Sequence, residues 1–113
     1  MHESLSRPLS PLTLHILTAV AREDMHGYAL IKAVREDSRG AVSPGTGSLY
    51  AAVQRLIDEG LLAARAPESP GRRGSVYSIT PAGRGAVLRE KNRLDDLLQL
   101  IDDSAVLAAE TGD

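Results

Sequence analysis

The sequence predicts a mainly α-helical fold with one small β-hairpin, in which three short helices and the hairpin precede a long C-terminal helix. Two observations support this fold class. Apolar residues recur at steps of three and four in four separate segments, which is the period of a helix with one buried face. Between the third and fourth segments, two short strand-like runs flank PESPGRRG (67–74), whose prolines and glycines predict a hairpin loop. The length of 113 residues suits one small domain with an appended element.

The first helix is predicted to begin at Ser10-Pro11, because a serine can cap free amide groups and a proline at the first helical position loses no hydrogen bond. The polar break REDM separates it from a second predicted helix, HGYALIKAVRED (26–37). The next segment, SRGAVSPG (38–45), is predicted to be a loop because it carries Gly and Pro. A third helix then runs to about Gly60, which closes it.

The hairpin strands are expected at 61–66 and 75–80. Thr80-Pro81 repeats the Ser-Pro start signal, and a long helix is predicted from about Ala82 to about Ala108. One stripe of this helix is apolar and has nothing left in the chain to cover it: Val87, Leu94, Leu97, Leu98, Ile101 and Ala105. Pairing with a second copy would bury this stripe, and folding back onto the same domain is the alternative.

The third helix has two unlike faces. On a wheel of 100° per residue, its core side carries Leu49, Ala52, Val53, Leu56 and Ile57. The opposite side gathers Ser48, Ala51, Gln54, Arg55 and Asp58. Its first turns are small and uncharged, so another surface can approach closely. The alternative is an amphipathic helix whose outer side only faces water.

That opposite side suits nucleic acid. Gln54 and Arg55 can offer donors and acceptors to base edges, and the methyl group of Ala51 can touch a thymine methyl. The uncrowded helix start at Thr46-Gly47-Ser48 favours phosphate. Asp58 and Glu59 would repel phosphate at the other end, so contacts are expected on the first half of the helix.

The hairpin loop strengthens this interpretation. Arg72-Arg73 lies between glycines in a loop with little apolar content to bury, so its tip should project and reach phosphates or the minor groove. Two helices joined by a turn and followed by a basic hairpin form the winged helix-turn-helix arrangement, in which the second of the pair enters the major groove.

The charge distribution says more than the net charge of −2. Residues 61–93 hold seven basic and two acidic side chains, a net of +5, whereas residues 94–113 hold six acids and no base. A basic middle beside an acidic tail is a local field that selects partners. Scattered solvated charge is the alternative.

The chain resembles the PadR family of bacterial transcriptional regulators. The matching segments are MHGYALIKAV (25–34), GTGSLYAAVQRLIDEGLL (45–62) and GRRGSVYSITPAGR (71–84), within roughly residues 9–85. The resemblance implies a homodimeric repressor whose long C-terminal helix pairs two subunits. Two-fold symmetry then predicts a near-palindromic operator in double-stranded DNA. The lack of a secretory signal or membrane span predicts a cytoplasmic protein. The candidate DNA-binding residues are Thr46, Gly47, Ser48, Tyr50, Ala51, Gln54, Arg55, Arg72 and Arg73. Tyr50 either packs or sends its hydroxyl to a phosphate, and Tyr77 is expected to pack beneath the wing.

The expected organisation is an N-terminal arm (1–8), a winged helix-turn-helix domain (9–80, with the wing at about 62–80), a dimerisation helix (81–108) and an acidic tail (109–113). Family members often sense small molecules. This chain has no Trp or Phe, and its three tyrosines all lie in the DNA-binding domain. Aromatic stacking of an effector on the last helix is therefore unsupported, and no ligand is named.

Other classes find little support. The chain has no cysteine, so thiolate metal sites and cysteine nucleophiles are excluded. His15 and His26 have no further ligand at metal spacing, and no nucleophile–base set or phosphate loop indicates an enzyme or a cofactor. No apolar run approaches a membrane span, and the N-terminus does not resemble a secretory signal. The alternative function is a winged-helix protein-interaction module, supported by the net negative charge and the acidic tail.

Overall fold

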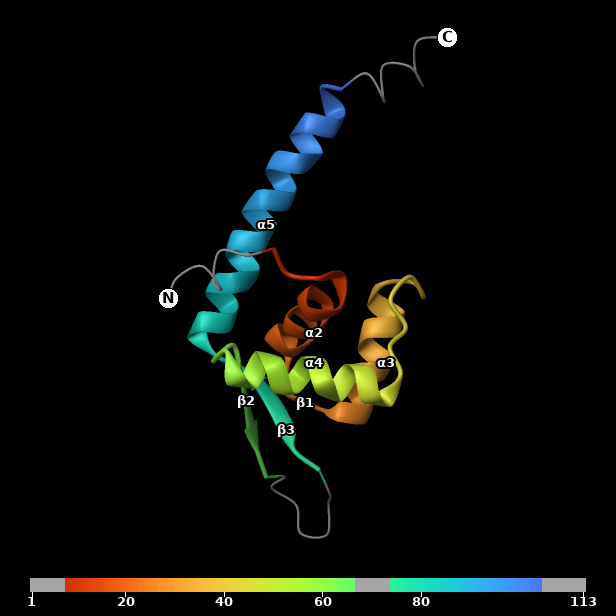
Figure 1. The fold of residues 1–113 in the computed structure, drawn as a ribbon, viewed down its shortest axis with the longest axis vertical. Helices are drawn as coiled ribbons and strands as arrows, with labels where there is room; N and C mark the ends of the chain where they lie inside the picture. Colours follow the sequence, from red (N-terminus) through yellow and green to blue (C-terminus); the bar gives the residue numbers. More distant parts are fainter. Residues whose placement is uncertain (1–7, 67–73, 105–113) are drawn as a thin grey trace.

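A computed structural model describes residues 8–66 and 74–104. Along the chain it places α2 (Pro11–Arg22), β1 (Met25–His26), α3 (Gly27–Asp37), α4 (Thr46–Asp58), β2 (Leu62–Arg65), β3 (Val76–Ile79) and α5 (Pro81–Asp102). The helices α2, α3 and α4 pack together and the hairpin projects from one end of them. α5 starts near the base of the hairpin, and its C-terminal part extends beyond the opposite end (Figure 1). The predicted class, mainly helical with a small antiparallel sheet and a long C-terminal helix, is confirmed.

The two hydroxyl-Pro signals start helices as predicted. The side chain of Ser10 accepts a hydrogen bond of 3.1 Å from the amide of Thr13, and Pro11 is the first residue of α2. Thr80 does the same for α5, where its hydroxyl accepts a 2.9 Å hydrogen bond from the amide of Gly83. In both places a side-chain oxygen satisfies an amide that has no partner within its helix.

The sheet has a third strand that the sequence did not reveal. The strand order is β1-β3-β2 and all pairs are antiparallel. β1 pairs Met25 with Tyr77 and His26 with Val76. A strand of two residues is too short to show an alternating pattern, which is why the segment reads as a polar break. Through β1 the wing is hydrogen-bonded to the start of α3.

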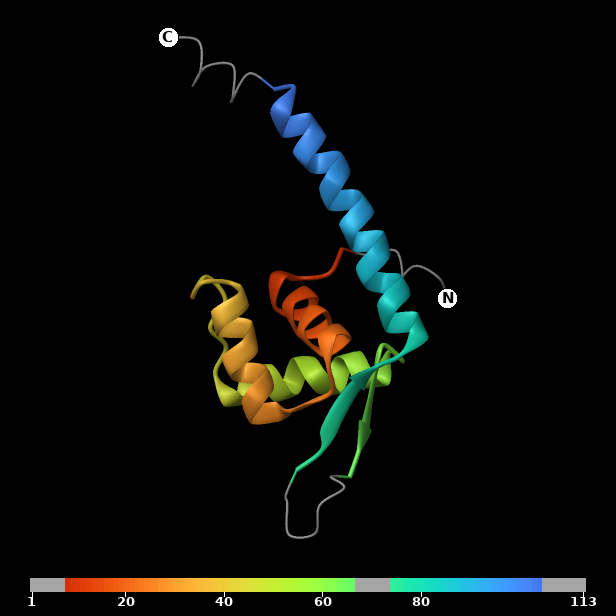
Figure 2. The ribbon, with the colours of Figure 1, turned by 180° about the vertical axis from the view of Figure 1, so that it is seen from behind.

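The core lies between α2, α3, α4 and the base of the wing, and α2 is at its centre (Figure 2). The predicted core side of α4 is buried except for Ile57, which is half-buried. The largest side chains that are fully buried are Ile16, Leu17, Leu30, Leu49, Leu56, Val20, Val34 and Val53. Each of these contributes about 1.5–3 kcal/mol relative to an exposed position.

The start of α5 crosses the wing closely. A Cβ on Gly83 would lie 2.7 Å from the side chain of Ile79 and would also meet the backbone carbonyl of Leu61. At its other end α5 stops at Asp102, where the prediction was about Ala108. Asp103 is the C-cap, and its amide donates to the carbonyl of Gln99 at 3.0 Å. Ala105 and the rest of the predicted extension lie outside the described residues.

Candidate DNA-binding surface

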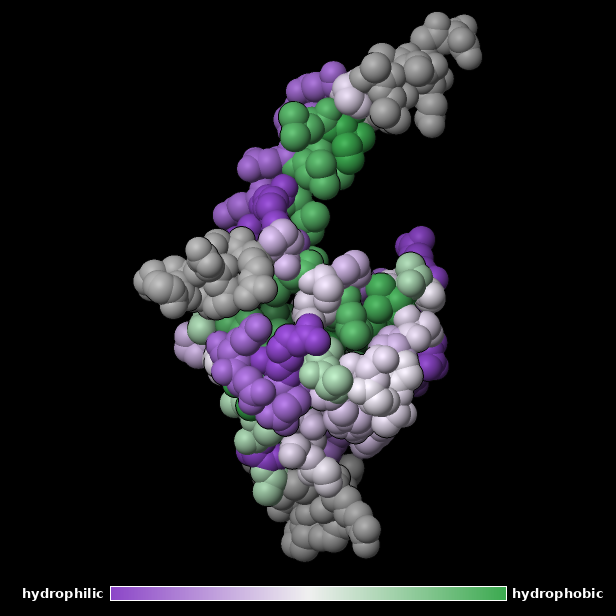
Figure 3. Space-filling view, viewed as in Figure 1, coloured by the Kyte–Doolittle hydropathy of each residue, from purple (hydrophilic) through white to green (hydrophobic). Residues whose placement is uncertain are grey.

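The outward side of α4 is open to solvent. Its candidate residues Thr46, Gly47, Ser48, Tyr50, Ala51, Gln54 and Arg55 are all exposed. Leu49, Ala52, Val53 and Leu56 on the other side are buried. Figure 3 shows the surface of this helix as pale over its first turns and purple towards its C-terminal end. The helix therefore has a free, lightly charged side, which contact with nucleic acid requires.

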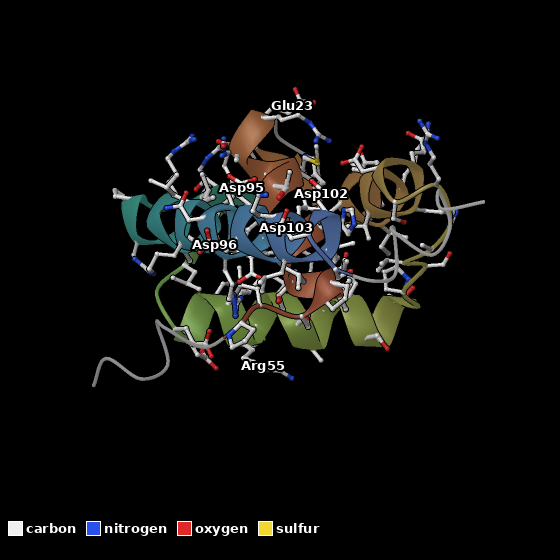
Figure 4. All side chains as sticks on the ribbon, turned by 90° about the horizontal axis from the view of Figure 1, so that it is seen from above. Glu23, Arg55, Asp95, Asp96, Asp102 and Asp103 are labelled. Carbon is white, nitrogen blue, oxygen red and sulfur yellow. The ribbon has the colours of Figure 1, made fainter. Side chains whose placement is uncertain are left out.

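The two candidate base readers sit differently. The side-chain amide of Gln54 donates a 2.9 Å hydrogen bond to Oδ1 of Asp58, one turn later, so it lies along the helix surface. Arg55 borders a shallow cleft formed with Leu9, Ser10 and Glu59. Figure 4 shows Arg55 on the outer side of α4, away from the labelled carboxylates of α5. To contact a base, the side chain of Gln54 would have to give up its hydrogen bond to Asp58 and form one to DNA.

The wing projects from the end of the domain opposite to the free end of α5 (Figures 1 and 2). Its predicted phosphate contacts, Arg72 and Arg73, lie outside the described residues. At the described end of β2, Arg65 forms an ion pair of 3.0 Å with Asp24, just before β1. Such an exposed pair adds little stability.

Tyr50 packs against Gly27, the first residue of α3, although the side chain keeps 40% exposure. The sequence left open whether Tyr50 packs or reaches phosphate, and the structure places its ring at the junction of α4 and α3. Tyr77 is only 8% exposed, as expected for a residue beneath the wing. Burial raises the pKa of Tyr77, and the nearby phenol of Tyr50 raises it further.

One exposed feature near this junction escaped the sequence reasoning. The rings of His26 and Tyr28 stack with centroids 5.6 Å apart and planes inclined by 20°. Tyr28 is 65% exposed. The only signal in the sequence is a pair of ring-bearing residues on either side of Gly27, which carries little information without the fold.

The apolar stripe of α5 is divided between two environments. Val87, predicted at the dimer interface, is half-buried against the domain's own core, because the first turns of α5 lie on α2. Beyond it Leu94, Leu97, Leu98 and Ile101 are exposed, between 38% and 58%. Figure 3 shows them as a green band along the helix. A groove between α2 and α5 continues the band, lined by Leu14, Thr18, Val87, Lys91, Leu94, Asp95 and Leu98.

Other kinds of site are not seen in the described ranges. Among residues 8–66 and 74–104, no cluster of three or more metal-ligating side chains could hold a metal ion. In the same ranges no helix is long and apolar enough to cross a membrane.

A helix pair with an open second helix, followed by a hairpin that packs beside it, defines a winged helix-turn-helix protein. The model of the transcriptional regulator PadR-like family matches residues 16–89. The chain therefore belongs to the PadR-like family, whose members are transcriptional regulators and not enzymes.

Relatives agree with this assignment. The chain is 37% identical over 84 residues to the transcriptional regulator Rv3488 of Mycobacterium tuberculosis, an overlap that covers 74% of this chain and 76% of the relative. It is 34% identical over 82 residues to the transcriptional regulator YqjI of Escherichia coli, covering 73% of this chain. The chain spans only 37% of YqjI.

Solved structures share the fold. A PadR family transcription regulator from Clostridium difficile superposes with a TM-score of 0.72 at 22% identity, over 83% of this chain and 97% of that one. The putative transcriptional regulator TA0346 of Thermoplasma acidophilum superposes with a TM-score of 0.67 at 30% identity, covering 81% of this chain and 87% of that one.

Proposed function

We propose that this PadR-like regulator is a dimeric, sequence-specific DNA-binding repressor that acts in the cytoplasm. In this proposal α4 enters the major groove, and its open side from Thr46 to Arg55 meets the bases and the nearest phosphates. Thr46, Gly47 and Ser48 lie beside the phosphates of the DNA backbone. Ala51 lies against a thymine methyl, and Gln54 and Arg55 contact base edges. The observation that carries the proposal is the exposed, lightly charged side of α4 beside a wing.

Charge supports the same orientation. Asp58 is the last residue of α4 and Glu59 is its C-cap, so the helix before Asp58 carries no acidic residue that would repel phosphate. The wing tip adds Arg72 and Arg73, which we assign to the DNA backbone. Replacing both by Ala should reduce the slope of log K against log salt by about 0.9 for each lost phosphate contact. An unchanged slope would remove them from the backbone contacts.

The exposed stripe of α5 supports dimerisation. Leaving Leu94, Leu97, Leu98 and Ile101 in water forgoes roughly 1.5–3 kcal/mol for each side chain that a partner could fully bury. A two-fold dimer would present two copies of α4 to a near-palindromic operator with half-site centres about 10 bp apart, or a multiple of that. A small-molecule effector would have to be held by Leu, Val and polar groups, since α5 carries no aromatic residue.

The second candidate is a protein-interaction module that keeps the winged-helix scaffold without sequence-specific DNA binding. The net charge of −2 and the acidic tail favour it. Selection of bound fragments from random DNA by the full chain separates the two. The repressor proposal predicts enrichment of one near-palindromic sequence, whereas recovery of unenriched DNA would favour the interaction module.

A further inference from the structure

Tyr50 lies where α4 meets the start of α3. A Cβ placed on Gly27 would lie closest to the hydroxyl oxygen of Tyr50 and would stand 2.6 and 2.7 Å from two carbons of its ring, closer than real Cβ atoms come to their neighbours. Gly27 does not have a positive φ, so its backbone conformation is open to other residues. A side chain at position 27 would therefore force the phenol of Tyr50 to move, because the phenol occupies the volume that the side chain would fill.

The start of α3 is tied to the wing. Gly27 directly follows β1, whose Met25 is paired with Tyr77 of β3. The Tyr50 phenol also contributes to the raised pKa of Tyr77, which is buried beneath the wing. The side chain of Tyr50 thus packs on the start of α3, which β1 connects to the base of the wing.

We propose that Tyr50 is a positioning residue that joins α4 to the wing and holds the two at one fixed separation and angle. The inference rests on the proposed function, since both elements must reach the same stretch of DNA together. An interface that is already in its bound arrangement avoids the cost of ordering on binding. The role belongs to the ring, which fills the junction, and not to a hydroxyl contact with phosphate.

The DNA test compares Tyr50→Phe with Tyr50→Leu on the selected DNA fragment, at a temperature where circular dichroism shows both to be folded. Phe keeps the ring, so it should bind about tenfold more tightly than Leu, a difference near 1.4 kcal/mol. If the two variants are equally weak, the hydroxyl and not the ring carries the effect, and positioning by the ring is wrong. If both bind like the unchanged chain, the junction does not position α4.

A thermal-unfolding cycle tests the contact without DNA. Gly27→Ala should lower the unfolding temperature in the unchanged chain, and much less in a Tyr50→Ala background, where the added methyl has room. Gly85→Ala is the matched control, because a Cβ there meets only the Arg89 side chain, at 3.5 Å. Equal losses from Gly27→Ala in both backgrounds would overturn the contact.

Titration of the tyrosine ring signals by NMR gives a second readout that does not need DNA. Tyr50→Phe should lower the pKa of Tyr77 and leave its burial in place, whereas Tyr28→Phe should leave the Tyr77 titration unchanged. A Tyr77 titration unaffected by Tyr50→Phe would contradict the junction. If the cycle and the titration behave as expected while the unchanged chain binds no DNA, the proposed function has failed and the junction stands.

Discussion

The backbone amide of Leu9 donates a hydrogen bond of 3.2 Å to Oε1 of Glu90, across 81 positions of sequence. The Glu90 side chain is 8% exposed and also forms an ion pair with Arg93. The bond ties the segment before α2 to the first half of α5. It therefore helps to fix the direction in which the long helix leaves the domain.

Glu90→Ala should destabilise the fold, because it leaves the Leu9 amide and Arg93 without this acceptor. Losing the partner of a fully buried donor costs about 1–3 kcal/mol, and this bond is partly buried, so a cost near the lower end is expected. Glu90→Gln keeps a neutral acceptor and should cost less. Asp95→Ala is the control, since it removes the exposed Lys91–Asp95 pair, which is worth about 0.3–0.5 kcal/mol. Urea unfolding measures all three, and equal costs for Glu90→Ala and Asp95→Ala would contradict a buried role for Glu90.

Two neighbouring glycines of α5 should respond in opposite ways to alanine. At Gly83 the new methyl would press on Leu61 and Ile79, and such overpacking costs about 1–3 kcal/mol. At Gly85 a Cβ has ordinary contacts, so the higher helix propensity of alanine should stabilise by up to about 1 kcal/mol. Thermal unfolding of the two variants checks this, and a loss of similar size at both positions would show that α5 does not cross the wing as closely as described.

Stability should fall at high pH because of Tyr77. Burial and the Tyr50 phenol raise its pKa in the folded chain above the ordinary value of 10.0. The unfolded chain then loses this proton first, so it binds fewer protons than the folded chain and the free energy of unfolding falls with pH. This contribution is fully present below pH 10.0 and is lost as pH rises through the folded-state pKa. Tyr77→Phe should flatten that slope in urea unfolding, and Tyr28→Phe should not. Equal slopes in all three chains would contradict the assignment.

Dimerisation through α5 can be tested with two leucines. Leu98 belongs to the exposed stripe, whereas Leu100 points about 120° away from Leu94 around the helix. Leu98→Asp should give a monomer at micromolar concentration in analytical ultracentrifugation, and Leu100→Asp should remain dimeric. Loss of the dimer in both variants would mean that the interface is not confined to the stripe.

Local signals made much of the fold predictable. Ser10 and Thr80 cap helices through residues three positions away, and the two faces of α4 follow from its period, so short stretches of sequence carry both features. The end of α5 was predicted too late, because its apolar steps continue past Asp102, where the helix stops.

The contacts that sequence reasoning missed join distant segments. β1 is only two residues long and exists because β3 pairs with it. The packing of Tyr50 on Gly27 and the bond from Leu9 to Glu90 depend on how elements are placed in space, which no local pattern records. The helical wheel of α5 groups Val87 with the exposed leucines, but it does not show that α2 covers the first turns of α5.

The most direct test of the account is a fluorescence-anisotropy titration of the full chain with its selected DNA fragment, at low and high salt. The control pair is Arg55→Ala on the open side of α4 and Arg22→Ala, whose side chain is paired with Asp37 on α3. We predict binding that weakens steeply with salt, and an Arg55→Ala loss of about 1–3 kcal/mol in discrimination between the selected and a scrambled fragment, with no such loss for Arg22→Ala. Binding that is absent at micromolar protein, or insensitive to salt, would contradict it.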